Sequence, residues 1–365
     1  MNRGDLDRLL RRVADADGSD LHLKVGSVPR IRVHGDLIRL TEEVGPQPAE
    51  LEAIAKEIMP ERIWDGFEKR FEADFAYAIM GLGRFRVNGY RQRGSIGMVF
   101  RLVRSSARTF EDLGLPEAVR RLADEQRGLV LVTGPTGSGK TTTLAAMIDH
   151  INHTRECHIV TIEDPIEVLH RDEVAAISQR EVGFDTEGFL IALRSALRED
   201  PDVILVGEMR DAETVSTALS AAETGHLVLS TLHTVDAVET VNRVVDFFPP
   251  GQQRQARITL AGALKGTICQ RLVPTSDGAS RVPALEIMVV NGRIQQTIID
   301  PTRGTDILEI IREGEYYGMQ SFDQSLVNLL EQGVIDLRAA TQASSNPHDL
   351  RVALQRRGLV PSAAR

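Results

Sequence analysis

The sequence predicts a two-domain α/β protein with a small N-terminal α+β domain, a mostly parallel sheet covered by helices on both faces, and a helical C-terminal region. Its 365 residues are too many for one typical domain and comfortable for two. The pattern also changes along the chain, from short alternating stretches to apolar runs separated by helical spacing. We therefore expect an N-terminal domain at 1–104, a linker at 105–115, a core at 116–290 and a helical region at 291–365.

The N-terminal domain is expected to combine helices with antiparallel strands. Leu6, Leu9, Leu10 and Val13 follow the spacing of one helix face, and turn-forming residues come next. The further elements expected are strands at 21–25 and 31–34, a helix at 50–59, and a hairpin of strands at 71–79 and 85–90 that turns at 81–83. Residues 103–115 mix polar and helix-breaking types without periodicity, which indicates the domain boundary.

The core is predicted from apolar runs that alternate with helical patterns, as in a parallel sheet with connecting helices. Strands are expected at 129–132, 158–162, 203–206 and 227–230, and helices at 142–151, 189–197 and 214–222. Further along, Phe322, Leu326, Leu329 and Leu330 recur at helical spacing. This tail is expected to form a small helical appendage that packs on the core.

The composition is that of an ordinary globular protein, with 42% hydrophobic and 26% charged residues. A net charge of -9 and only 4% aromatic residues argue against nucleic acid as the main partner. We find no run of about 18 apolar residues, so we expect no direct membrane span and a cytoplasmic location. Cys157 and Cys269 lack the spacing of a zinc site, and both are expected to be small buried hydrophobic residues.

The strongest local signal is the run GPTGSGKT at residues 134–141, which fits G-x-x-x-x-G-K-[ST] between a predicted strand and a predicted helix. Glycines are needed because backbone N–H groups must turn inward around phosphate oxygens. Lys140 supplies a point charge to the β- and γ-phosphates, and the Thr141 hydroxyl can bind Mg²⁺. The alternative, a plain glycine-rich connector, does not account for the flanking elements. The nucleotide contacts expected here are Gly134, Pro135, Thr136, Gly137, Ser138, Gly139, Lys140, Thr141 and Thr142.

Hydrolysis needs a carboxylate at the end of a neighbouring strand, and two predicted strands end in acids. Glu208 follows the apolar run at 203–206, and Glu163 follows the run at 158–162. An acid at a strand end often serves only solubility, but a phosphate loop in the same sheet favours a catalytic role. His226 and His233 flank the predicted strand at 227–230, and we expect them to report on the γ-phosphate, although a single histidine is usually structural.

Four segments, in this order, resemble the secretion ATPase superfamily. GPTGSGKT, TIEDPIE, LREDPDVILVGEMRD and TGHLVLSTLHT resemble its Walker A loop, aspartate box, Walker B strand and histidine box. SDLHL near residue 19, GRFRVNGYRQRG at 83–94 and GMQSFDQSL at 318–326 look like the pilus-retraction branch, the PilT family of twitching-motility ATPases. The resemblance therefore extends over nearly the whole chain.

The resemblance implies a PAS-like N-terminal domain, a RecA-like P-loop ATPase core, and roles for individual residues. Lys140 and Thr141 would bind phosphates and Mg²⁺, Glu163 would polarise the attacking water, and Glu208 would be the Walker B carboxylate that serves Mg²⁺. His226 and His233 would sense the γ-phosphate. Arginines of the N-terminal domain would reach the ATP, and the candidates are Arg86, Arg93, Arg101 and Arg104.

The same resemblance implies a cytoplasmic homohexamer that associates with the inner membrane through a platform protein of the pilus machine. Assembly ATPases of the superfamily carry an extra N-terminal region and a tetracysteine zinc insertion, so their absence here favours retraction over extension or type II secretion. Residues 292–300, GRIQQTIID, depart from the basic helix that retraction ATPases have at this place. The alternatives are a motor for secretion, pilus assembly or DNA uptake, a nucleic-acid motor with a RecA-like core, and a nucleotide switch without turnover.

Overall fold

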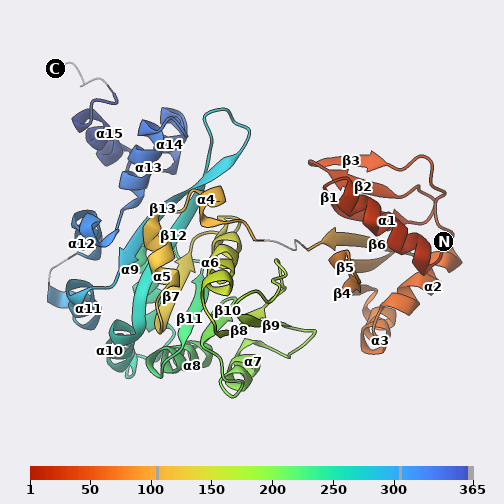
Figure 1. Ribbon diagram of the computed structural model, residues 1–365, viewed down its shortest axis with the longest axis horizontal. Helices are drawn as coiled ribbons and strands as arrows, with labels where there is room; N and C mark the ends of the chain where they lie inside the picture. Colours follow the sequence, from red (N-terminus) through yellow and green to blue (C-terminus); the bar gives the residue numbers. More distant parts are fainter. Residues whose placement is uncertain (104–106, 304–305, 361–365) are drawn as a thin grey trace. The chain divides into compact units, whose positions relative to one another are not determined.

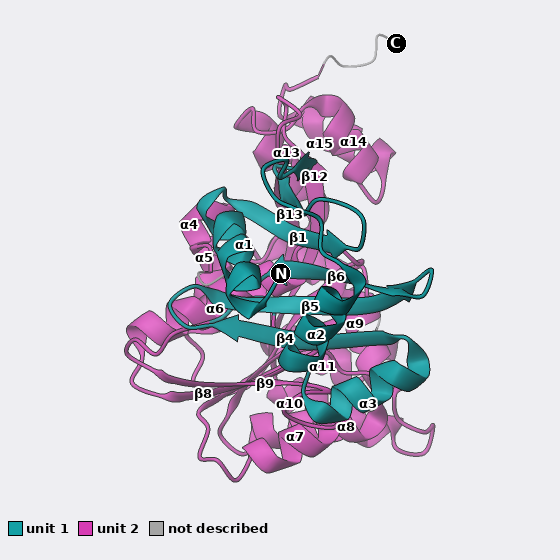
Figure 2. Ribbon diagram, turned by 90° about the vertical axis from the view of Figure 1, so that its right-hand side faces the viewer, with its two compact units in different colours: residues 1–106, 167–169 teal, residues 107–166, 170–365 magenta. Residues whose placement is uncertain are grey.

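The computed structural model describes residues 1–103, 107–303 and 306–360 of the chain (Figure 1). The chain forms two compact units, residues 1–106 with 167–169 and residues 107–166 with 170–365 (Figure 2). Within the described ranges, none of the helices combines the length and the apolar composition that a membrane span needs.

Unit 1 is a six-stranded antiparallel sheet with three helices, and its strands lie in the order β3-β2-β1-β6-β5-β4. The expected helices, strands and hairpin are confirmed, whereas the sequence pattern does not predict β3, α3 or β6. β3 is exposed along its whole length, and α3 buries only two side chains, so neither shows a clear periodicity. The elements are α1 (Arg3–Asp15), β1 (Gly18–Lys24), β2 (Arg30–Val33), β3 (Asp36–Arg39), α2 (Pro48–Ile58), α3 (Glu61–Arg70), β4 (Glu72–Ile79), β5 (Gly83–Gln92) and β6 (Ser95–Leu102).

The core of unit 1 lies between the helices and one face of this sheet. Leu21 of β1, Phe100 of β6 and Val87 of β5 lie directly opposite one another on adjacent strands, and all three are buried. Leu6 and Leu9 of α1 pack into the same core. Because side chains alternate along a strand, the intervening residues face the other way, and these include several arginines.

Unit 2 contains a seven-stranded sheet in the order β13-β12-β7-β11-β10-β8-β9. Neighbouring strands are parallel except β13, which runs antiparallel to β12. Every strand expected in the core is confirmed, and β9, β12 and β13 are additional. The strands are β7 (Gly128–Thr133), β8 (His158–Glu163), β9 (Ala176–Glu181), β10 (Val203–Val206), β11 (Leu227–Leu232), β12 (Leu264–Pro274) and β13 (Arg281–Val289).

Helices cover both faces of this sheet, which explains why its strands read as continuous apolar runs. In β7, Leu129 and Leu131 enter one core, and Val130 and Val132 enter the other. The first core includes α7 (Phe189–Ala196), α8 (Ala212–Glu223), α9 (Ala237–Asp246), α10 (Gln253–Ala263), α11 (Gly292–Ile299) and α12 (Ile307–Glu313), and the second includes α4 (Phe110–Leu113), α5 (Glu117–Ala123) and α6 (Lys140–Thr154). Cys269 is buried as expected, whereas Cys157 is only half-buried.

The expected C-terminal appendage consists of α13 (Phe322–Glu331), α14 (Leu337–Ala343) and α15 (Pro347–Arg356). The segment GMQSFDQSL attaches it to the sheet. Gln320 and Ile287 of β13 exchange backbone hydrogen bonds of 2.8 and 3.1 Å, and the Leu285 N–H donates to Ser325 Oγ at 3.1 Å. Ser321 caps α13. The polar residues of this segment therefore join the appendage to β13.

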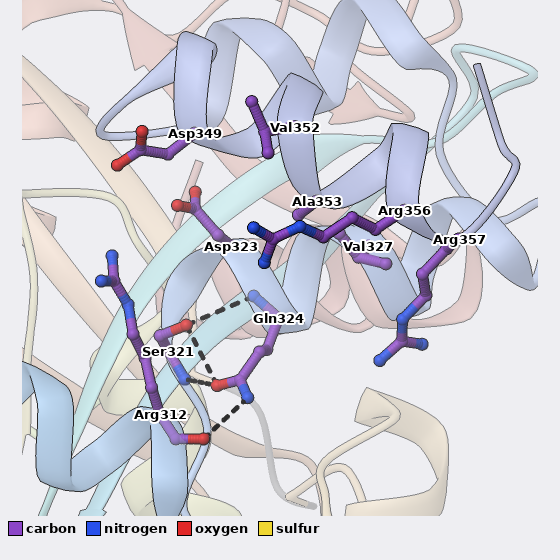
Figure 3. Close-up of a pocket in the computed structure, with 10 residues that line it drawn as sticks. All are labelled: Arg312, Ser321, Asp323, Gln324, Val327, Asp349, Val352, Ala353, Arg356 and Arg357. Atoms are coloured by element: carbon purple, nitrogen blue, oxygen red, sulfur yellow. Dashed lines mark hydrogen bonds between the residues drawn. The ribbon is translucent and has the colours of Figure 1, made fainter. Parts of the chain in front are cut away.

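A cavity of about 370 Å³ lies among the helices of the appendage (Figure 3). Two of the polar residues around it form hydrogen bonds to neighbouring helices. Gln324 Nε2 donates to the Arg312 carbonyl at 3.1 Å, and Ser344 Oγ donates to Asp323 at 2.9 Å. The first contact joins α13 to α12 and the second joins it to the end of α14, so we interpret the cavity as a result of how the short helices pack.

Glu286 of β13 is a buried carboxyl group whose ionisation is coupled to folding. Its side chain accepts a hydrogen bond of 2.8 Å from the Ala237 N–H at the start of α9. Burial raises the pKa of Glu286 to about 7 in spite of that hydrogen bond, and the nearby Asp236 carboxylate acts in the same direction as burial. Because the folded chain holds this proton more tightly, the stabilisation is complete below the ordinary pKa of 4.5 and is lost as pH rises through 7.

Replacing Glu286 by glutamine retains an acceptor for the Ala237 N–H and removes the titration. We expect Glu286→Gln to raise the free energy of unfolding by roughly 3 kcal/mol at pH 8, because no buried charge forms there, and to change it little at pH 4.5. Urea unfolding at both pH values measures the difference. An equal effect at the two pH values would show that the carboxyl group does not titrate in this range.

Candidate nucleotide site

The loop at residues 134–141 joins the carboxyl end of β7 to the start of α6, as the sequence predicts. Gly134, Gly137 and Gly139 have φ values of 143, 78 and 89°, in a region that favours glycine. A Cβ at Gly134 would lie 2.3 Å from the Gln270 carbonyl oxygen, and one at Gly139 would lie 2.7 Å from Gln270 Nε2. Gly137 has open space, so backbone conformation alone accounts for that glycine.

The start of α6 has the features of an anion site. Its N-cap is Gly139, which provides no capping side chain, and the first turn contains no acidic residue. The first N–H groups of a helix lack partners within the helix and carry a partial positive charge. Ser138 Oγ is buried, and the described part of the chain provides no hydrogen-bond partner for it. These groups fit a phosphate, which would accept hydrogen bonds from them.

Lys140 is held against the loop and is only 9% exposed. Its Nζ donates to the carbonyl oxygens of Gly134 and Pro135 at 2.8 and 3.1 Å. Burial lowers the pKa of Lys140, and the charge of Glu208 opposes that shift. The ammonium group and the Glu208 carboxylate therefore lie close enough to interact. Thr141 and Thr142 follow on the first turn of α6 and are both half-buried.

Glu208 lies just beyond the carboxyl end of β10, on the same edge of the sheet as the loop. Its side chain is half-buried, forms an ion pair with Arg210, and lies 3.6 Å from Nε2 of His233. His233 follows β11, and its side chain is exposed. The structure thus brings Lys140, Glu208 and His233 to one place, as the sequence predicts for three residues that follow parallel strands.

Glu163 is the last residue of β8, which pairs with β10. Its carboxylate is only 8% exposed, and Oε1 accepts hydrogen bonds from Thr161 Oγ1 at 2.7 Å and Gln179 Nε2 at 3.1 Å. These bonds fix the orientation of the carboxylate, and β8 places it on the carboxyl edge of the sheet with Glu208. Asp164, the next residue, lies on the surface.

The structure does not bring His226 to this edge. His226 precedes β11, and its carbonyl accepts a hydrogen bond from the N–H of Gly128 at the start of β7. Six strand residues separate it from His233, which corresponds to about 20 Å along the sheet. Its Nδ1 contacts the Ala221 carbonyl at 2.9 Å, at the end of α8. Within this chain only His233 lies on the edge of the phosphate loop, and the γ-phosphate role expected of His226 stays a prediction.

The two histidines give a direct test of this placement. We expect His233→Ala to lower the rate of phosphate release by about tenfold, because a polar group beside Glu208 is lost, and His226→Ala to change it less than twofold. Loss of the contact with Ala221 is expected to destabilise the His226 variant by about 1 kcal/mol. Phosphate-release assays and urea unfolding measure the two effects. A larger loss of activity in the His226 variant would contradict the assignment.

The residues on this edge fit a magnesium ion. Thr141 offers a hydroxyl oxygen and Glu208 a carboxylate oxygen, and both are ligand types that Mg²⁺ prefers. Proteins usually hold Mg²⁺ through one or two carboxylates, with substrate phosphates and water completing the coordination. A nucleotide on the loop would supply the remaining oxygens.

The arginines expected to reach the nucleotide belong to unit 1. Arg86 and Arg101 lie directly opposite each other on β5 and β6. Arg101 Nε donates to Asp20 Oδ1 at 2.8 Å. Burial alone would raise the pKa of Asp20. The hydrogen bonds from Ser19 and Arg101 outweigh the effect of burial, so the pKa of Asp20 is lowered. Arg93 is exposed in the turn between the two strands. Arg104 lies outside the described residues.

A cavity of about 900 Å³ opens beside the loop, and the sequence does not predict it. Gly139 and Thr142 of the loop region line one side, and Leu272 and Val282 of the β12–β13 hairpin line another. Its size and position suit the part of a ligand that extends from phosphates on the loop. Only the pairing of β12 with β7 brings the hairpin here, and that pairing leaves no local signal in the sequence.

A phosphate loop between a parallel strand and a helix, in a sheet covered on both faces, defines a P-loop protein with a RecA-like core. A protein-family model described as Type II/IV secretion system protein matches residues 4–315. The chain belongs to this family.

Individual relatives are similar over nearly the whole chain. The type IV pilus retraction ATPase PilT of Pseudomonas aeruginosa is 45% identical over 94% of this chain and 99% of its own. A twitching motility protein of Neisseria gonorrhoeae is 44% identical over 88% of this chain and 86% of its own. A crystal structure of the pilus retraction motor PilT with bound ADP is 44% identical, with a TM-score of 0.85 over 94% of this chain and 98% of that chain.

Proposed function

We propose that this chain is the ATP-hydrolysing subunit of a motor that retracts type IV pili. The observation that carries the proposal is the meeting of Lys140, Glu208 and His233 at one edge of the sheet, beside a loop that fits phosphate. The similarity to PilT, 45% identity over 94% of the chain, supports the choice of pilus retraction among the secretion ATPases.

In the proposed reaction, backbone N–H groups of the loop and Lys140 bind the β- and γ-phosphates. Thr141 and Glu208 hold Mg²⁺, which neutralises charge on the phosphate oxygens when bound. Glu163, oriented by Thr161 and Gln179, polarises the water that attacks the γ-phosphorus in line with the leaving oxygen. His233 detects the γ-phosphate through its position beside Glu208.

Further parts of the proposal concern assembly and domain roles. Six copies form a ring in the cytoplasm, which acts on an inner-membrane platform protein. Residues 1–104 form the domain whose Arg86, Arg93, Arg101 and Arg104 compensate charge on the γ-phosphoryl group, and residues 105–115 link it to the core at 116–290 and the helical region at 291–365. Arg93 and Arg101 are both exposed, although Arg101 Nε also donates to Asp20.

A complementation experiment tests the motor assignment. The chain is expressed in a bacterium that has pili but lacks its own retraction ATPase, with Glu208→Gln as the inactive control. We expect twitching motility to return with the native chain only. Light scattering of the purified protein with ATP is expected to show six chains per particle. If the protein hydrolyses ATP as a hexamer and motility does not return, the motor acts on a different machine.

A further inference from the structure

Gln270 is a buried amide that joins the phosphate loop to the first turn of α6. It lies on β12, one residue after Cys269, which pairs with Thr133 at the end of β7. Its side chain is only 3% exposed. Nε2 donates to the Ser138 carbonyl at 2.7 Å, and Oε1 accepts from Thr143 Oγ1 at 2.8 Å. One side chain therefore joins the loop to the first turn of α6.

The bond to Ser138 determines the direction of a phosphate-binding group. A trans peptide is planar, and its carbonyl and N–H point in opposite directions. Because Gln270 holds the Ser138 carbonyl, the Gly139 N–H of the same peptide points away from Gln270. Gly139 is the N-cap of α6, so this N–H belongs to the set of unpaired donors at the helix start.

The backbone of the loop also packs closely around Gln270. A Cβ at Gly134 would lie 2.3 Å from the carbonyl oxygen of Gln270, and a Cβ at Gly139 would lie 2.7 Å from Nε2 of Gln270. The first and last glycines of the loop therefore lie against the same residue. Because these atoms lie so close together, the Gln270 amide restricts the orientation of the peptide bond between Ser138 and Gly139.

We propose that Gln270 is a positioning residue that holds the phosphate loop in its anion-binding shape. The inference rests on the proposed function, since it concerns the same ATP site, and it assigns a role to a residue outside the loop motif. Thr143 acts with Gln270. The Thr143 hydroxyl donates to Oε1 and so fixes the orientation of the amide, which leaves Nε2 to donate to the Ser138 carbonyl.

The test compares variants of Gln270 and Thr143 in the full-length protein. Gln270→Leu keeps the approximate volume and removes both bonds, and Gln270→Glu replaces the donor by an oxygen next to the Ser138 carbonyl. Thr143→Val removes one bond, and Thr143→Ser retains it. The readouts are KM and kcat for Mg²⁺-dependent phosphate release from ATP, and the rise in melting temperature that ADP causes.

Asn152 offers a matched control, because it lies on α6, the same helix as Thr143. It is 1% exposed, its Nδ2 donates to the Arg171 carbonyl at 2.7 Å, and its Oδ1 accepts from the Glu173 N–H at 3.2 Å. It lies 12 positions after Lys140, roughly 18 Å along α6. Asn152→Leu therefore loses a buried amide with two hydrogen bonds far from the loop.

We expect KM for ATP to rise about tenfold in Gln270→Leu, more in Gln270→Glu and about threefold in Thr143→Val, with Thr143→Ser near the native value. The stabilisation by ADP is expected to fall in the same order. Asn152→Leu is expected to lower the melting temperature without changing KM. If Gln270→Leu does not fold, the Thr143 pair still decides the question.

The proposal is overturned if the Gln270 and Thr143 variants lose stability like Asn152→Leu but keep the native KM and the native response to ADP. If the native chain binds no ATP, the proposed function is contradicted instead. That outcome is measured on the native protein without any variant.

Discussion

Replacing Lys140 by alanine is expected to lower the rate of phosphate release by about 10²–10³-fold. The Lys140 ammonium group is buried in the loop and donates hydrogen bonds to two carbonyl oxygens. Burial strengthens its attraction to a phosphate. Because burial also makes this charge costly, we expect the melting temperature without nucleotide to change little. A phosphate-release assay and thermal unfolding of the same preparation measure both quantities.

Lys265→Ala is the control for this variant. Lys265 lies at the opposite edge of the sheet, beside Gly128, and pairs with Glu125 at 3.2 Å. The variant loses the same charge and a similar volume, and we expect turnover to remain within about twofold of the native rate. Equal losses in the two lysine variants would mean that overall charge, and not the loop, controls turnover.

Glu208→Gln is the second change with a large expected effect. The substitution preserves the shape of the side chain but removes its negative charge. In the native protein, that charge interacts with Lys140, and the carboxylate is the proposed ligand of Mg²⁺. We expect kcat to fall about 10²–10³-fold while ATP still binds, because the loop and Lys140 are unchanged. Stopped-flow phosphate release and equilibrium binding of a fluorescent ATP analogue separate the two steps.

Glu213→Gln provides a control that changes the same charge on α8. Glu213 is exposed, and its carboxylate forms a surface ion pair with Arg194 at 3.4 Å. Its loss is expected to leave kcat and ATP binding near their native values. The assignment of Glu208 fails if Glu208→Gln keeps full turnover, or if it loses ATP binding and hydrolysis in equal measure.

Residues that follow a predicted parallel strand could be placed from the sequence. Lys140, Glu163 and Glu208 all come at or shortly after the carboxyl end of a strand, and such ends share one edge of the sheet. His226 precedes its strand, so the same rule places it at the opposite edge. The γ-phosphate role expected of His226 stays a prediction, and it was made from the spacing to His233 without the length of the strand between the two residues.

Contacts that depend on strand order could not be predicted in this way. Gln270 lies more than a hundred residues beyond the loop, and its position depends on the pairing of β12 with β7. α10 also leads into β12 without an intervening turn, so no turn-forming residues separate the helix from the strand. The fold class and the phosphate loop follow from local patterns, whereas the support behind the loop follows from the tertiary arrangement.

Mg²⁺-dependent phosphate release by the native protein, measured together with ATP binding in the same preparation, tests the central claim most directly. The account predicts repeated turnover that requires Mg²⁺ and reaches far more than one phosphate per chain. Tight binding of ATP without any release of phosphate would contradict it, because the chain would then act as a nucleotide-dependent switch and not as a motor.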